Sequence, residues 1–142
     1  MTNSTAPKWL TATGIAALLW NALGCMAYLA DVRTTPEELA ALPLAQQQLL
    51  ASRPAWAIAG SAVAVWAGLF GSLGLVLRRR WAFPLLVASL IGVLVQDYAM
   101  FVVARVIDVL GIVPLVLQSL VLLIAVLLVL LARKGVAQGW LK

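Results

Sequence analysis

Three amides and one acid stand inside apolar stretches of this chain, and they are the side chains whose chemistry could matter most. They are Asn21, Gln96, Asp97 and Gln118. An acid at the centre of a bilayer costs about 2.5 to 3.5 kcal/mol on insertion scales, so it normally faces protein or water and marks a binding site or a proton pathway. We therefore expect Asp97 to be protonated at neutral pH, or to reach water through a crevice.

The residue types that are missing exclude most catalytic chemistry. The chain has no histidine and one cysteine, which excludes haem held by histidine, histidine metal sites and nucleophiles paired with histidine. It also has no second intramembrane acid to form a carboxylate dyad with Asp97. The sequence therefore predicts a protein that is not an enzyme and that holds no metal and no cofactor.

The composition predicts a multi-pass membrane protein. Of the 142 residues, 64% are hydrophobic and 11% are charged, whereas a soluble domain is about 25% charged. Four apolar stretches have the length of about 20 residues that a helix needs to cross a bilayer; they cover residues 9–30, 55–77, 81–104 and 111–132. Backbone groups in lipid must bond internally, so we predict an all-α transmembrane four-helix bundle and a single membrane domain over residues 1–142.

The positive charges orient this bundle, because cytoplasmic loops carry an excess of lysine and arginine. Seven positive residues fall on one predicted side and three on the other. The seven are Lys8, Arg78, Arg79, Arg80, Arg133, Lys134 and Lys142, and the three are Arg33, Arg53 and Arg105. Both termini are therefore predicted to be cytoplasmic. Since these charges stand at the ends of apolar stretches, they indicate topology and not a nucleic-acid partner.

The predicted outer loop, residues 31–54, is the only sizeable polar segment. Thr35, Pro36 and Glu38 have the spacing of a helix N-terminus with a capping box. Pro43 is expected to end this helix, and a second short helix to follow it. Leucines would give both helices an apolar side, so the loop is expected to lie on the bilayer surface or to cap the bundle, with a lid over a substrate as the alternative.

The second apolar stretch carries a stripe of small residues at every fourth position. The stripe consists of Gly60, Ala64, Gly68 and Ser72. Small residues let neighbouring helices approach closely, and this contact is a main source of helix association in lipid. The stripe is therefore a predicted packing interface, either with another helix of the chain or with a second copy in a homo-oligomer.

The four polar residues fall in neighbouring layers of the predicted bundle. Counting 1.5 Å per residue from the middle of each stretch, Asn21 lies near the centre, while Gln96, Asp97 and Gln118 lie about 4 to 8 Å towards the outer side. The three amides could surround Asp97 in a ligand or proton site. Trp20 and Trp66 also lie near mid-membrane and could wall such a cavity. Alternatively, the amides only provide hydrogen bonds between helices.

Two resemblances bear on the first stretch. Ala22-Leu23-Gly24-Cys25 loosely resembles the end of a bacterial lipoprotein signal; otherwise Cys25 is a small packing residue. Small multidrug transporters have a similar size and four helices, but the essential glutamate of their first helix has no counterpart here, where Asn21 is the polar residue.

Longer segments resemble a family of small bacterial four-span proteins of the inner membrane. The segments are LLWNALGCMAY, TPEELAALPLAQQQ, RPAWAIAGSAVAVWAGLFGSLGLVLRRRWAFPL and SLIGVLVQDY. Members of this family are described as membrane proteins or as sugar transporters, and the resemblance implies a bacterial inner membrane but transfers no site residues.

Two functions follow from the sequence. In the first, the protein binds or transports a small solute or lipid through the polar cluster around Asp97. In the second, it is a non-catalytic scaffold or regulatory subunit that acts through helix packing. The lipid bilayer is a partner in both.

Overall fold

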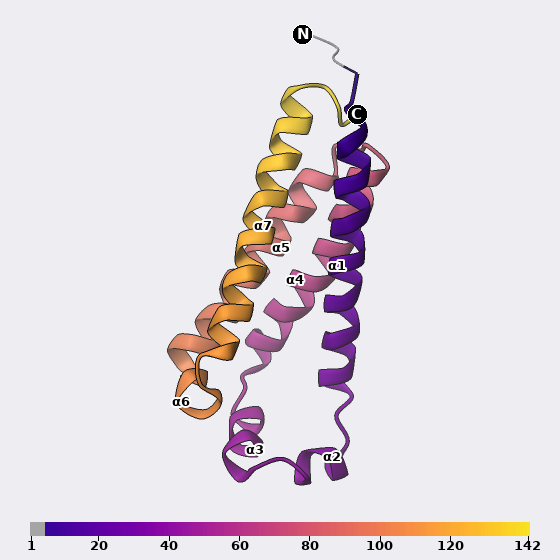
Figure 1. The fold of residues 1–142 in the computed structure, drawn as a ribbon. Coiled ribbons are helices and arrows are strands. Elements are labelled where there is room, and N and C mark those ends of the chain that lie inside the picture. The colour runs from indigo at the N-terminus through magenta and orange to yellow at the C-terminus, as the bar shows by residue number, and fades with distance from the viewer. Residues whose placement is uncertain (1–4) are drawn as a thin grey trace.

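The computed structural model describes residues 5–142, and all regular elements in this range are helices (Figure 1). Three long helices are uninterrupted: α1 (Lys8–Val32), α4 (Ala55–Val76) and α7 (Val113–Ala137). The fourth consists of α5 (Ala82–Asp97) and a π-helix, η1 (Tyr98–Val103). Short helices connect them: α2 (Pro36–Ala40), α3 (Leu44–Ala51) and α6 (Val106–Leu110).

The four long helices are apolar enough to cross a membrane, which confirms the predicted all-α fold with four spans. Their bounds differ from the predicted ones mainly in α7, which continues beyond residue 132 to Ala137. The charged residues Arg133 and Lys134 do not stop a helix, because their long side chains can reach water while their backbone stays helical. The helix ends only before Gly139, which has a φ of 72°.

The long helices pack in chain order, α1 against α4, α4 against α5 and α5 against α7. The start of α1 and the end of α7 lie at one end of the bundle, which we call the terminal end, and α2, α3 and α6 lie at the other, the loop end (Figure 1). At the terminal end a buried cluster joins α1 to α7; it includes Leu10, Leu75, Leu128 and Leu141. The backbone N–H of Lys142 donates to Arg78 at 2.8 Å, which holds the C-terminal residues against the turn between α4 and α5.

The small-residue stripe of α4 packs inside the chain. A Cβ on Gly92 of α5 would lie 2.5 Å from the backbone nitrogen of Ala64 and 2.7 Å from the carbonyl oxygen of Gly60. Close to this contact, the Ser89 hydroxyl donates a hydrogen bond to the carbonyl of Ala64 at 2.6 Å. Gly68 lies against side chains of both α1 and α5. The four stripe residues are buried, so in this structure the stripe faces the chain's own helices.

The loop between α1 and α4 is helical, as predicted. The Thr35 hydroxyl accepts from the backbone N–H of Glu38 at 3.2 Å, and the Glu38 carboxylate accepts from the backbone N–H of Thr35 at 2.9 Å. This reciprocal pair confirms the predicted capping box. The side chain of Gln47 donates to the carbonyl of Leu42 at 2.8 Å, which holds α3 close to the end of α2.

The end of the third span departs from the predicted regular helix. From Tyr98 to Val103 the backbone forms a π-helix, in which the N–H of Ala104 bonds to the carbonyl of Ala99, five residues earlier. Arg105 then takes a left-handed conformation, with a φ of 50°, and starts the short helix α6. π-Helical turns are rare and are frequent at functional sites. Here the widened turn carries the end of the third span into α6.

Candidate binding cavity

A cavity of about 620 Å³ lies in the half of the bundle next to the loop end. Residues of all four long helices line it, together with residues of η1 and of the loop between α1 and α4. Most of the lining residues are apolar. The polar ones are Asn21, Tyr28, Asp31, Arg53, Ser61, Ser89, Gln96 and Gln118. The size lies within the range of about 300 to 1,000 Å³ that small-molecule sites have in other proteins.

The cavity is closed at the terminal end and open between α1 and α7. Leu86 and Leu128 line it and also belong to the buried cluster of the terminal end, so this cluster forms its floor. On the side between α1 and α7 the cavity is lined by Leu23 and Leu117, which are 63% and 58% exposed. A second hollow of about 310 Å³ lies between the same two helices and shares Trp20, Ile124 and Leu128 with the cavity. The cavity therefore opens sideways, towards the apolar surface of the bundle.

Gln96 and Gln118 meet in the cavity, one from α5 and one from α7. Their amide nitrogens point at the same atom, the sulfur of Met100, at 3.7 Å and 3.3 Å. A thioether sulfur is a weak acceptor, so neither N–H group has a strong partner there. The Gln118 side-chain oxygen is buried without any hydrogen-bond partner within residues 5–142.

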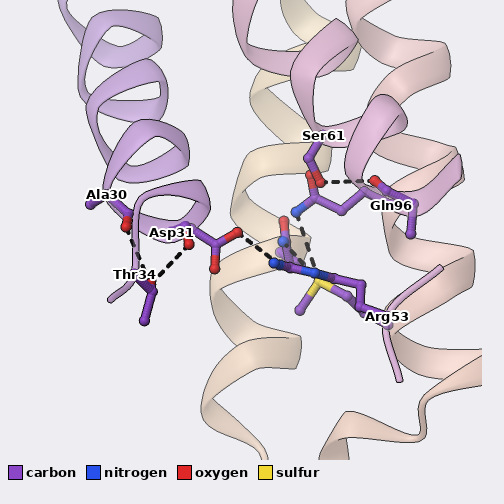
Figure 2. Close-up of polar contacts among 9 residues, drawn as sticks. Ala30, Asp31, Thr34, Arg53, Ser61 and Gln96 are labelled. Atoms are coloured by element: carbon purple, nitrogen blue, oxygen red, sulfur yellow. Dashed lines mark hydrogen bonds and ion pairs between the residues drawn. The ribbon is translucent and has the colours of Figure 1, made fainter. Parts of the chain in front are cut away.

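Arg53 extends into the same space from the segment between α3 and α4. Its Nη1 forms a 2.8 Å ion pair with Asp31 at the end of α1, and Figure 2 shows this pair beside the side chain of Gln96. The Arg53 Nε is buried and has no hydrogen-bond partner in the described part of the chain. Leaving a buried polar group unpaired costs about 1 to 3 kcal/mol. Two such atoms, Arg53 Nε and Gln118 Oε1, therefore belong to side chains that line one cavity.

Asn21 takes part in helix packing. Its side-chain nitrogen donates to the carbonyl of Ala17 at 2.9 Å and to the hydroxyl of Ser72 on α4 at 3.1 Å. Ser72 is fully buried. Asn21 also lines the cavity, but its donors are used between α1 and α4. This arrangement agrees with the alternative that some of the amides provide hydrogen bonds between helices.

Asp97 is not among the residues that line the cavity, so the amides do not surround it as predicted. On α5 the cavity side carries Ser89, Val93 and Gln96, and the exposed side carries Leu94 and Tyr98. Asp97 is about 100° further round the helix than Gln96 and lies between these two sides. One of its carboxyl oxygens is buried without a partner among the described residues. Gly92 faces α4, and helical spacing puts Asp97 on the opposite flank of the cavity side.

The two tryptophans predicted to wall the site have different positions. Trp20 lines the cavity on the side that continues between α1 and α7. Trp66 does not line it and is 37% exposed. It follows Ala64 by two residues, which turns it about 200° around α4, away from the side that faces the cavity.

Three further residues of the site were not predicted from the sequence: Asp31, Arg53 and Met100. Asp31 and Arg53 stand at the two ends of the outer loop and have opposite charges, and this could have suggested an ion pair that closes the loop. No feature of the sequence distinguishes Met100 from other apolar residues of the span. Within residues 5–142 no group of three or more histidine, cysteine, aspartate or glutamate residues could hold a metal ion.

Comparison with known proteins adds no relative. No protein-family model, curated protein or solved structure matches this chain. The resemblance to small bacterial four-span proteins therefore stays a prediction, and the function has to be argued from the cavity.

Proposed function

We propose that this multi-pass membrane protein binds a small molecule in the cavity between its four long helices, as a transporter or a solute-binding protein does. One observation carries the proposal: two side chains that line a cavity of ligand size, Arg53 and Gln118, each have a buried polar atom without a partner among residues 5–142. A ligand that turns both side chains towards itself and pairs with these atoms, Arg53 Nε and Gln118 Oε1, would remove the cost of leaving them unsatisfied. The cavity's few polar groups on apolar walls are also typical of small-molecule sites.

We propose that the loop end faces the outside of a bacterial inner membrane. The seven positive residues near the termini and near the turn between α4 and α5 support this orientation through the positive-inside rule. In this orientation the half of the bundle that holds the cavity would lie towards the outside, and the cluster around Leu141 would close the cytoplasmic end.

The scaffold function has less support. It would use the small-residue stripe of α4 as an interface with another protein, but Gly60 and Gly68 are covered by side chains of α1 and α5. The homo-oligomer that the sequence also suggested would need another surface.

Mass spectrometry of the intact protein in detergent tests the proposed function. We expect the purified protein to carry one small molecule that can be identified after release. Ala125→Phe places a large side chain into the cavity, because Ala125 lines it, and should abolish this bound mass.

Leu123→Phe is the matched control. Leu123 lies two residues away on α7, is 54% exposed and does not line the cavity, so this variant should keep the bound molecule. A bound mass that survives Ala125→Phe, or the absence of any specifically bound molecule, would contradict the proposal.

A further inference from the structure

The polar part of the cavity offers more hydrogen-bond donors than acceptors. The amide nitrogens of Gln96 and Gln118 point at the Met100 sulfur, and the buried Nε of Arg53 has no partner. An oxygen atom of a ligand would be a better acceptor for these groups than a thioether. The side-chain oxygen of Gln118, which has no partner among the described residues, needs a hydrogen-bond donor. A hydroxyl group of a ligand can accept hydrogen bonds through its oxygen and donate one through its hydrogen, so a hydroxylated head group suits both kinds of group.

The charges of the cavity indicate a neutral head group. Among the described residues, the charged side chains that line the cavity are Asp31 and Arg53, and they form an ion pair with each other. Their charges therefore cancel. An anionic ligand would leave one negative charge uncompensated in a site of low polarity, and a cationic ligand one positive charge, and both are costly. Asp97, the nearest other acid on α5, does not line the cavity.

The apolar part of the cavity suits a hydrocarbon chain. It opens between α1 and α7 beside the second hollow, whose lining is mostly apolar and includes Ala16, Trp20, Leu127 and Leu131. Because these helices cross the bilayer, this opening faces lipid. A molecule that lies partly in the membrane can therefore pass its chain sideways through the opening while its head remains at Arg53.

We propose that the ligand is a neutral amphipath with one hydrocarbon chain and a hydroxylated head, taken from the membrane leaflet at the loop end. The inference rests on the proposed function and specifies its ligand class. The head lies among Arg53, Gln96 and Gln118, and the chain leaves between α1 and α7.

Probes that share one chain and differ in their heads test this inference. Monooleoylglycerol is neutral, oleate is anionic and oleylamine is cationic, and binding of each to the full chain is titrated by mass spectrometry of the intact protein. We expect monooleoylglycerol to bind at one per protein and about tenfold more tightly than either charged probe. Glycerol alone, which lacks the chain, should not compete with it.

Removing the acid of the ion pair should change this preference. Asp31→Asn leaves the Arg53 charge uncompensated, so oleate should bind about tenfold more tightly than it does to the wild type. Asp108→Asn is the matched control, because it removes an exposed acid that pairs with Arg105 and does not line the cavity; it should leave oleate binding unchanged. The comparison of heads on the wild type decides the inference even if Asp31→Asn does not fold.

The outcomes separate the inference from the proposed function. Equal or tighter binding of oleate or oleylamine at a site blocked by Ala125→Phe overturns the neutral head, and competition by glycerol overturns the need for a chain. In both cases the proposed function stands. It also stands if none of the probes binds but the purified protein carries another molecule that Ala125→Phe removes. If neither assay finds a ligand, both proposals fail.

Discussion

At the scale of single residues, Asp97 and Gln118 have different environments although both lie in the outer half of the predicted bundle. Gln118 lines the cavity, and its side-chain oxygen has no partner among the described residues. Asp97 does not line the cavity. Substitution of a residue that binds the ligand should change the ligand affinity, whereas substitution of a residue that only affects packing should change the stability. We therefore compare substitutions at Gln118 and Asp97 by both measurements.

Gln118→Leu should weaken binding of the cavity ligand about tenfold, because it removes both a donor and an acceptor from the site. The measurement is a titration of the identified ligand by mass spectrometry of the intact protein. Unchanged affinity in a folded Gln118→Leu variant would show that the amide does not contact the ligand.

Asp97→Asn should leave that affinity within about twofold and raise the free energy of unfolding by about 1 kcal/mol, since a neutral amide is less costly to bury than a carboxylate whose buried oxygen has no partner among the described residues. Thermal unfolding in detergent measures the stability change. A large loss of binding without a loss of stability would return Asp97 to the site that the sequence predicted for it.

The sequence predicts the depth of these side chains but not the direction in which they point. A count along each span places Gln96, Asp97 and Gln118 in one layer, and Gln96 and Gln118 do meet there. The rotation of α5 about its axis depends on which residues pack against α4, and Gly92 sets it by direct backbone contact. Since one residue along a helix is a turn of about 100°, that rotation separates Asp97 from Gln96.

At the scale of the helices, the most extensive contact is between α4 and α5. It places the backbone of Gly92 against Gly60 and Ala64, and it fixes which side of α5 faces the cavity. The small-residue stripe predicted this kind of contact from α4 alone. The sequence left open whether its partner was a second copy, because small residues allow close approach to any helix.

Gly92→Ala should lower the free energy of unfolding by about 1 to 3 kcal/mol, because the added methyl group overlaps backbone atoms that cannot move aside. Gly24→Ala is the control. A Cβ there would lie 3.4 Å from Val65, at ordinary contact distance, so this variant should unfold like the wild type. Equal stability of the two variants would contradict the packing of α4 against α5.

The loop and the end of the third span differ in how predictable they were. The capping box of Thr35 and Glu38 acts locally, so its residues alone identify the start of α2. The π-helix from Tyr98 to Val103 has no comparable local signal; its contacts are with α6 and, through Met100 and Gln118, with α7. The position of Arg53 also has no local signal in the sequence, because its partner Asp31 is distant in the chain and the fold of residues 33–54 brings the two together.

At the scale of the whole molecule, the bundle is closed at the terminal end and hollow towards the loop end. Leu10, Leu75, Leu86 and Leu141 are almost completely buried at the terminal end. Trp9 and Trp140 pack edge to face there, with ring centroids 5.7 Å apart. The C-terminal residues are therefore part of the fold, and they close the terminal end of the bundle.

Leu141→Ala should lower the free energy of unfolding by about 2 to 5 kcal/mol, the usual cost of removing a buried leucine side chain. Leu130→Ala serves as the control, because Leu130 is 52% exposed on the surface of α7. Thermal unfolding of both variants in the same detergent provides the comparison. If both lose the same stability, the C-terminal residues do not close the bundle.

The central claim is that the space between the four long helices is a cavity that molecules enter, and thiol labelling in lipid nanodiscs tests it most directly. Gln118→Cys and Ser119→Cys are made separately in a Cys25→Ala background; Gln118 lines the cavity, while Ser119 lies at nearly the same depth on the exposed surface of α7. A water-soluble thiol reagent needs a thiolate, which forms in water and not in hydrocarbon. We predict that Gln118→Cys reacts at least about tenfold faster than Ser119→Cys. Equal rates, or no reaction at either position, would contradict a cavity that water and other molecules enter.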